Sequence, residues 1–221
     1  VWATLLATIF GTIAGVLRTT PKLFNRLVAR TYVELIRNVP PLVLIFISYF
    51  FVSDQIMPLL GVDDFVRERS ETAQHIISFF FASPAMLTAF LSGVITVAVF
   101  QGAYITEIVR AGIQSIDKGQ WEAAYALGLS WWQQMYDIIM PQAIKRVLPP
   151  LANEFINTLK YSAIVSVISI QELTFQGMQV MAATQVTIEV WLTITLMYLV
   201  LCLILSFAVQ WLERHLARSE A

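Results

Sequence analysis

The chain has 221 residues, of which 57% are hydrophobic and 13% charged, and its mean hydropathy is +0.70. A soluble domain carries roughly 25% charged residues, so this composition indicates a membrane protein. Fourteen Lys plus Arg against fifteen Asp plus Glu leave a net charge of −1, which argues against a nucleic-acid partner, and the single cysteine, Cys202, excludes a disulfide within the chain.

Five apolar segments are candidates for membrane-spanning helices, because about 20 apolar residues are needed to cross the hydrocarbon core. In chain order they are Trp2–Leu17, Pro41–Leu60, Met86–Ile105, Leu148–Ile170 and Val190–Leu212. The first is short, and Val1 already belongs to its apolar run, so we expect a chain truncated at its amino end. The shorter stretch Ile76–Ala82 predicts a periplasm-side helix that leads into the third span.

The segment between the first two spans, Arg18–Arg37, predicts an amphipathic helix that starts near Thr20-Pro21. Its cations fall within an arc of about 80° at 100° per residue, away from most of its apolar side chains. These cations are Lys22, Arg26, Arg30 and Arg37. Such a helix is either an interfacial anchor that touches lipid headgroups or a contact with a partner subunit.

Positive charges concentrate on alternate connections, which predicts the orientation of the chain. Arg18–Arg37 holds five Lys or Arg, Thr106–Val147 holds four and the tail after Leu212 holds two, whereas the connection from Ser53 to His75 holds Arg67 and Arg69 alone. We therefore expect a multi-pass protein whose amino terminus lies outside and whose carboxyl terminus lies in the cytoplasm.

The connection Glu107–Pro150, between the third and fourth spans, begins with the signals of a short cytoplasmic helix. Asp117 can cap a helix over about Gly119–Leu127, and Gly128 can end it in a left-handed conformation. Small residues on this helix would let another backbone approach closely, and an exposed charge would mark the contact. These residues are Ala123, Ala124 and Glu122.

A second helix is predicted immediately after the first. Ser130, with Gln133 three residues later, has the spacing of a capping box, in which side chains and backbone N–H groups pair reciprocally. Pro141 is expected to end this helix, because a proline inside a helix removes a backbone hydrogen bond. The two helices together predict a compact helix-turn-helix on the cytoplasmic face.

The fourth span is unusually polar, and polar groups within the membrane commonly mark a transport pathway. Asn153, Asn157 and Lys160 recur at intervals of four and three and predict one polar stripe, with Glu154 and Tyr161 on a neighbouring face. The amides suit contact with a zwitterionic substrate, since they donate and accept hydrogen bonds. Alternatively, the two asparagines join helices by interhelical hydrogen bonds.

Three further residues each have two alternative interpretations. Lys160 either lies on the pathway or forms an ion pair with Glu154 or Glu172. Gln101, in the third span, either lines the pathway or makes a hydrogen bond at a span end. Glu172, beyond the fourth span, is either an external gate or part of a solvated turn.

The cytoplasmic connection carries the spacing EAA-x3-G-x9-I-x-L-P, with Met140 in place of the usual leucine. The matching residues are Glu122-Ala123-Ala124, Gly128 and Ile138-Ile139-Met140-Pro141. This pattern resembles the EAA signature of ABC importer permease subunits. The stretches RNVPPLV at 37–43, YITEIVRAGIQSIDKGQWEAA at 104–124 and LPPLANEFINTLK at 148–160 are similar to the polar amino-acid permease subfamily.

The resemblance implies an all-α membrane protein, the transmembrane domain of a type I ABC importer. It would have five core transmembrane helices and a cytoplasmic EAA coupling helix in a single domain over residues 1–221, with the coupling loop at about 107–150. The residues that couple to an ATPase would be Gly119, Glu122, Ala123, Ala124, Gly128 and Pro141. The substrate-pathway residues would be Asn153, Asn157 and Tyr161, with Gln101, Glu154 and Glu172 as further candidates.

The chain contains no G-x-x-x-x-G-K-[ST] phosphate-binding loop, so we expect a transport subunit that is not an enzyme and has no cofactor of its own. ATP and Mg²⁺ would bind to partner subunits. The resemblance implies two ABC ATPase subunits, a second permease chain, identical or related, and a periplasmic amino-acid-binding protein. The complex would lie in the lipid of the bacterial inner membrane.

One residue departs from the subfamily pattern. Many members continue LKDTSL, whereas this chain continues Leu159-Lys160-Tyr161-Ser162-Ala163-Ile164, so that Tyr161 replaces an acid. A carboxylate is the natural counterion of a cationic side chain, so the phenol favours neutral or acidic amino acids. Alternatively, Tyr161 fills the pocket of a permease that binds no substrate and pairs with one that does. A structural membrane anchor is the remaining alternative.

Overall fold

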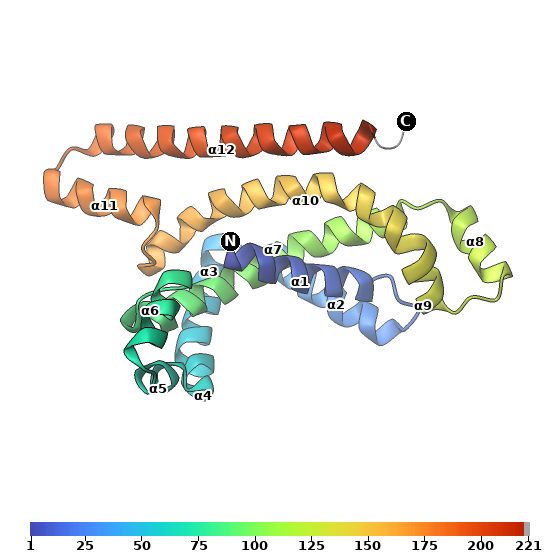
Figure 1. The fold of residues 1–221 in the computed structure, drawn as a ribbon, viewed down its shortest axis with the longest axis horizontal. Helices are drawn as coiled ribbons and strands as arrows, with labels where there is room; N and C mark the ends of the chain where they lie inside the picture. The colour runs from blue at the N-terminus through green and yellow to red at the C-terminus, as the bar shows by residue number, and fades with distance from the viewer. Residues whose placement is uncertain (219–221) are drawn as a thin grey trace.

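The computed structural model describes residues 1–218, and that part of the chain is all-helical, as predicted (Figure 1). The longer helices are α1 (Trp2–Leu17), α2 (Leu23–Arg37), α3 (Pro41–Phe51), α6 (Glu71–Phe80), α7 (Leu87–Gln114), α10 (Met140–Ser162), α11 (Leu173–Thr184) and α12 (Thr187–Arg218). The shorter ones are α4 (Met57–Leu60), α5 (Val62–Arg67), α8 (Lys118–Ala126) and α9 (Trp131–Gln133). Two π-helical turns lie at Val52–Ile56 and Gln134–Ile139, and two 3-10 turns at Pro84–Met86 and Ala163–Ile168.

Among the described residues, three helical segments are long and apolar enough to cross a bilayer: Pro41–Leu60, Pro84–Gln114 and Thr187–Trp211. They contain the second and third predicted spans and all but the last residue of the fifth. α1 has the predicted bounds but only 16 residues, fewer than a full crossing needs. Residues 148–168 of the fourth predicted span, Leu148–Ile170, are helical, in α10 and the 3-10 turn that follows it, but the helix starts earlier, at Met140, and is not among these three segments. The helix predicted around Ile76–Ala82 is α6.

α10 starts early because Pro141 does not end the preceding helix, contrary to the prediction. The chain passes from α9 through the π-helical turn Gln134–Ile139 directly into α10, and Pro141 lies in the first turn of α10. A proline is tolerated there because the π-helical turn directly before it absorbs the change in hydrogen bonding. Pro149 and Pro150 also lie inside α10, so prolines are poor markers of helix ends in this region.

α1 packs closely along α7 through small side chains. Ala7, Gly11 and Gly15 recur at every fourth position of α1 and are buried. A Cβ atom at Gly11 would lie 2.5 Å from Ile105 Cγ2, and one at Gly15 would lie 2.6 Å from Val109 Cβ. Small residues at this spacing let two helix backbones approach closely within a membrane. α1 and α7 therefore form a tight pair along the long axis of the molecule (Figure 1).

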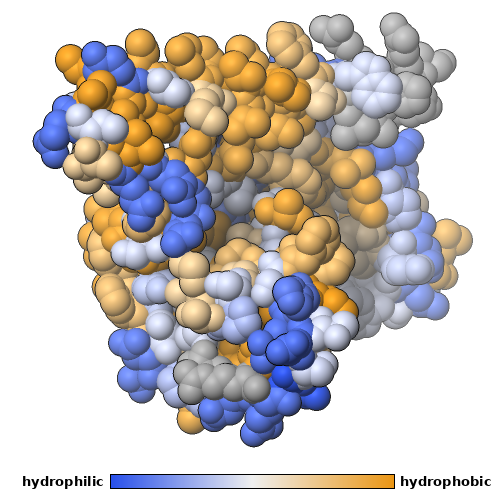
Figure 2. Space-filling model, turned by 60° about the vertical axis from the view of Figure 1, so that its left-hand side comes forward, coloured by the Kyte–Doolittle hydropathy of each residue, from blue (hydrophilic) through white to orange (hydrophobic). Residues whose placement is uncertain are grey.

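Much of the outer surface is apolar. α12 buries Ile194 but exposes most of its other apolar side chains, and the upper part of Figure 2, where α12 lies, is an almost continuous hydrophobic surface. On α2, Phe24 is 76% exposed and Leu35 is 62% exposed, while the opposite face of the helix is buried. Surfaces of this kind face lipid or another apolar subunit rather than water.

The predicted start of α2 near Thr20-Pro21 is wrong, since the helix begins at Leu23.

Candidate functional site

The connection between α7 and α10 contains a short helix that is capped at both ends. Asp117 Oδ1 accepts a hydrogen bond of 2.6 Å from the backbone N–H of Gly119 and starts α8. Gly128 follows the end of α8 with a φ of 73°, a left-handed conformation that glycine adopts without a steric penalty. Ser130 and Gln133 form the capping box of α9. The predicted caps of both helices are confirmed.

α8 projects from one end of the molecule and exposes a surface that a partner can contact (Figure 1). Tyr125 is 78% exposed and Leu127 is 76% exposed, whereas Ala124 is fully buried against the rest of the chain. Exposed aromatic and apolar side chains on a protruding helix are typical of a protein contact. The other predicted coupling residues are all exposed: Gly119, Glu122, Ala123, Gly128 and Pro141.

Hydrogen bonds attach the α8 segment to α10. Arg146 donates to the backbone carbonyl and to the hydroxyl of Ser115, which follows the end of α7. Gln142 Nε2 donates to the carbonyl of Ile138 at 2.8 Å and to Gln120 Oε1 of α8 at 3.3 Å. The sequence does not reveal these contacts, because the partners across the connection are 22 and 31 residues apart. α8 is therefore held to α10 by Gln120 and Gln142, and the ends of the two flanking helices, α7 and α10, are held together by Ser115 and Arg146.

A buried polar cluster joins α7 to α10. Gln101 is fully buried, and its Nε2 donates a hydrogen bond of 2.8 Å to Thr158 Oγ1, which in turn donates to the carbonyl of Glu154. Glu154 is 7% exposed, and its Oε2 accepts from Asn157 Nδ2 at 3.1 Å. The Oε1 atoms of Gln101 and Glu154 have no hydrogen-bond partner among the described residues. The cluster can therefore accept hydrogen bonds from an additional donor, such as an ammonium or an amide.

Tyr161 lies in an aromatic cluster where α2, α7 and α10 meet. The centroid of its ring is 5.3 Å from that of Phe100 and 6.4 Å from that of Tyr104. The guanidinium group of Arg37, at the end of α2, lies 5.4 Å from the centroid of the Tyr104 ring. The rings pack beside the buried residues of α2 and α7, so the phenol that replaces the acid of the subfamily is held in place by its neighbours.

The predicted polar stripe on α10 faces away from the core of this chain. Asn153 and Lys160 are exposed, and Asn157 is partly exposed. Asn153 Nδ2 donates to the carbonyl of Pro149 in its own helix at 3.3 Å. The stripe is therefore open to a ligand, to lipid or to a second chain, while the buried polar positions of α10 belong to Glu154 and its neighbours.

Glu172 caps α11 and holds it to α12. Its Oε1 accepts from the backbone N–H of Phe175 and its Oε2 accepts from the hydroxyl of Tyr198, each at 2.8 Å. Both carboxylate oxygens are thus engaged within the fold, which differs from the predicted solvated turn. The predicted ion pair of Lys160 with Glu154 or Glu172 is wrong, since no such contact occurs between these described residues.

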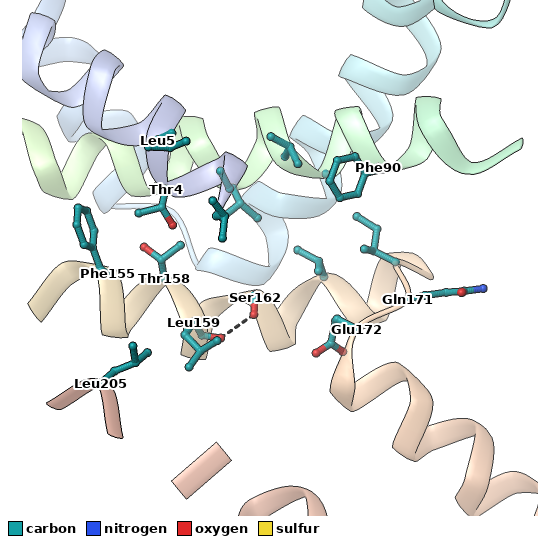
Figure 3. Close-up of a pocket in the computed structure, with 17 residues that line it drawn as sticks. Thr4, Leu5, Phe90, Phe155, Thr158, Leu159, Ser162, Gln171, Glu172 and Leu205 are labelled. Atoms are coloured by element: carbon teal, nitrogen blue, oxygen red, sulfur yellow. Dashed lines mark hydrogen bonds between the residues drawn. The ribbon is translucent and has the colours of Figure 1, made fainter. Parts of the chain in front are cut away.

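A groove of about 520 Å³ runs between α1, α7 and α10 and reaches the start of α11 (Figure 3). Its walls are largely apolar, although Thr4 and Thr158 face each other across it (Figure 3). Glu172 lines one end of the groove, whereas the other five predicted pathway residues lie outside its lining. An apolar groove suits a lipid chain or a neighbouring helix better than it suits a zwitterion.

Comparison with known proteins identifies the class to which this architecture belongs. Residues 7–218 match the family described as binding-protein-dependent transport system inner membrane component. The chain belongs to this family, and it is a permease subunit of an ABC importer. A multi-pass membrane subunit of this family works with an ATPase and a solute-binding protein.

The relatives share most of their length with this chain. It is 35% identical over 211 residues to the probable glutamine ABC transporter permease protein GlnM of Bacillus subtilis, covering 96% of this chain and 85% of the relative. It is 33% identical over 208 residues to the glutamine transport system permease protein GlnP of Escherichia coli, covering 94% and 83%.

Solved structures confirm the predicted fold of an ABC importer transmembrane domain. A crystal structure described as an amino acid ABC transporter with histidines matches with a TM-score of 0.74 at 34% identity, covering 97% of this chain and 87% of that one. The MetNI methionine ABC transporter, in an inward-facing conformation, shares the fold with a TM-score of 0.63 at 19% identity, covering 98% and 94%.

Proposed function

We propose that this chain is the permease of an importer for polar amino acids and that glutamine is the first candidate substrate. The observation that carries the proposal is its identity of 33–35%, over nearly the whole chain, to two permeases named for glutamine transport. Glutamine has a neutral side chain, and Tyr161 offers a phenol where a cation-binding permease would offer a carboxylate. The amide groups on α10 and α7 can donate and accept, as a zwitterion with an amide side chain requires.

The substrate contacts belong to α10 and to the cluster around Thr158. The unpartnered, buried oxygens of Gln101 and Glu154 support this assignment, because each needs a donor such as an ammonium or an amide. We assign substrate contact to Asn153, Asn157 and Tyr161, with Gln101, Glu154 and Glu172 as further candidates.

A second role is favoured by the aromatic cluster. Tyr161 packs against Phe100 and lies near Tyr104, so its ring takes up space that a substrate side chain would need. In this case the chain is the partner of a substrate-binding permease in a heterodimer, and it contributes the pathway wall and the coupling surface without a binding site of its own.

α8 acts as the coupling helix that seats in a groove of an ATPase subunit. The exposed Tyr125 and Leu127, the hydrogen bond from Gln142 of α10 to Gln120 of α8, and the bond from Arg146 of α10 to Ser115 at the end of α7 support this role. ATP binding draws two ATPase subunits together and tilts α8, and the contacts of Arg146 and Gln142 transmit the tilt to α7 and α10. The coupling residues are Gly119, Glu122, Ala123, Ala124, Gly128 and Pro141. ATP and Mg²⁺ bind to the ATPase subunits, and this chain performs no catalysis.

The complex contains two permease chains and two ATPase subunits in the lipid of a bacterial inner membrane, and a periplasmic amino-acid-binding protein delivers the substrate. The amino terminus lies outside and the carboxyl terminus in the cytoplasm. Two observations support this orientation: the cations concentrate in the connections assigned to the cytoplasm, and α12 ends at the same end of the molecule as α8 (Figure 1).

The test is ATP-dependent uptake by proteoliposomes that contain the complete complex, competed with a panel of unlabelled amino acids. Wild type is compared with Tyr161→Asp and with Tyr161→Phe, which keeps the ring and serves as the matched control. Competition by neutral or acidic amino acids, shifting toward arginine or lysine in Tyr161→Asp alone, supports a substrate site at Tyr161. An unchanged competition profile in both variants assigns the chain the second role, that of a permease that binds no substrate and pairs with one that does. Uptake that no amino acid suppresses contradicts the proposed function.

A further inference from the structure

Charged side chains meet where α1, α2 and α7 come together. Arg18, which follows α1, contacts the carboxylate of Glu107 on α7, and Arg110 donates to the same carboxylate at 2.7 Å. On α2, Arg30 pairs with Glu34 at 2.6 Å. These three cations outnumber the two anions with which they pair.

Arg37 is the cation that completes the group. It is exposed at the end of α2, stacks over Tyr104 and forms no ion pair among the described residues. We call the four guanidinium groups together the arginine joint: Arg18, Arg30, Arg37 and Arg110. Two carboxylates, those of Glu34 and Glu107, neutralise half of their charge, which leaves a formal excess of two positive charges.

A polar pocket of about 320 Å³ opens between Arg18 and Arg37 of the arginine joint. Its lining residues are Arg18, Val33, Glu34, Arg37, Asn38 and Glu107. The carboxylates of Glu34 and Glu107 are part of this lining, so the positive excess comes from Arg30 and Arg110, which lie outside it. The side chain of Arg18 is 16% exposed, and its burial, followed by the repulsion of Arg110, lowers its pKa. An anion in this pocket would relieve that repulsion and would accept charge-assisted hydrogen bonds from the guanidinium groups of Arg18 and Arg37.

The neighbouring surface of α2 indicates which kind of anion fits. At 100° per residue, the arc that holds Arg30 and Arg37 lies between the buried face of α2 and an exposed apolar face. On the apolar face, Leu27 is 50% exposed and Leu35 is 62% exposed. A cationic arc directly beside an exposed apolar face is the arrangement of a helix at the boundary between headgroups and acyl chains.

We propose that the arginine joint binds the phosphate of an anionic phospholipid, such as phosphatidylglycerol, and that an acyl chain of this lipid lies against the exposed apolar face of α2. Basic pockets between membrane helices are suited to such headgroups. A soluble phosphate would use the cations but not the apolar face. The lipid would connect α1, α2 and α7 next to the connection that leads to α8.

The experiment titrates the purified complete complex with phosphatidylglycerol and, separately, with phosphatidylcholine, and counts bound lipids by native mass spectrometry. Arg37→Gln should weaken phosphatidylglycerol binding about fivefold, the contribution of roughly one cation near a membrane surface, and should leave phosphatidylcholine binding unchanged. Arg37→Lys should retain most of the affinity. Arg26→Gln is the matched control, because it removes the same charge from α2 about 16 Å along the helix and outside the pocket, and it should bind as the wild type does.

Three results would overturn the proposal. Equal weakening by Arg37→Gln and Arg26→Gln would show a diffuse attraction of α2 to any anionic surface. Displacement of phosphatidylglycerol by an equal concentration of inorganic phosphate would show that the acyl chain contributes nothing. Unchanged lipid binding in Arg37→Gln, together with loss of the ATPase subunits during purification, would assign the arginine joint to an acidic partner protein.

Discussion

Replacing Gly112 of α7 with alanine should weaken the contact between α7 and α10, although alanine is the better helix former. A Cβ atom at this position would lie 2.2 Å from Val147 Cγ2, whereas ordinary van der Waals contact begins at 3.4 Å. Val147 is 9% exposed and β-branched, so few other rotamers are open to it. The overlap of about 1.2 Å, the difference of those two distances, must then be relieved by moving the two helices apart.

Overpacking of this kind destabilises by about 1–3 kcal/mol, which exceeds the gain of about 0.5–1 kcal/mol from replacing a helical glycine with alanine. The geometry also predicts that Val147→Ala relieves the overlap caused by Gly112→Ala. Once Val147 is alanine, the nearest atoms to the new Cβ are the Cβ of residue 147 and the carbonyl oxygen of Ala143, both at 3.6 Å. Val147→Ala alone loses two buried methyl groups, about 1.6 kcal/mol at ~0.8 kcal/mol each. The double variant should therefore be no less stable than Val147→Ala alone.

Thermal unfolding of the purified complex measures these effects as shifts of the midpoint temperature. Gly112→Ala should lower the midpoint, and adding Val147→Ala should bring no further loss beyond that of Val147→Ala itself. Ala111→Val enlarges the adjacent, exposed residue of α7 and should change the midpoint little. A Gly112→Ala variant as stable as the wild type, or additive losses in the double variant, would refute the close approach of α7 and α10.

Three further predictions follow from the caps and the buried cluster. Asp117→Ala removes the cap of α8 and should cost about 1 kcal/mol of local stability, seen as faster amide hydrogen exchange over residues 118–126; unchanged exchange would mean that the cap is dispensable. Gly128→Ala places a Cβ atom at a φ of 73°, which costs about 1–2 kcal/mol, so less ATPase should co-purify with it, and an undiminished yield would argue against coupling through this turn. Thr158→Val leaves the buried amide of Gln101 without its acceptor and should cost about 1–3 kcal/mol, whereas Gln101→Leu removes both polar atoms and should be nearly neutral; midpoint temperatures in the opposite order would contradict this reasoning.

Local signals were sufficient to predict local structure. The cap of α8 depends on Asp117 and the residues directly after it, and the capping box joins Ser130 to Gln133. The bounds of α1 and of the helical segment Pro41–Leu60 follow from predominantly apolar runs. In each case the interacting groups lie within about one helical turn of each other, so the pattern of neighbouring residues contains the information.

Contacts between distant helices could not be predicted in the same way. Periodicity showed which residues of α10 share a face but not which face is buried, and it is Glu154, rather than Asn153, that packs inside. The hydrogen bond from Gln101 to Thr158 joins residues 57 positions apart. The prediction that Pro141 ends a helix fails for a related reason, since the π-helical turn before it lets the helix continue.

The central claim is that this chain is an amino-acid permease driven through α8. Its most direct test is ATP-dependent uptake of labelled glutamine by proteoliposomes that contain the complete complex. We expect the uptake to require ATP and the solute-binding protein and to be suppressed by excess unlabelled glutamine. The variant Leu127→Asp, on the exposed side of the α8 turn, should abolish this uptake without lowering the thermal midpoint of the permease. Uptake that proceeds without ATP, or that is equal in Leu127→Asp and wild type, would contradict this function.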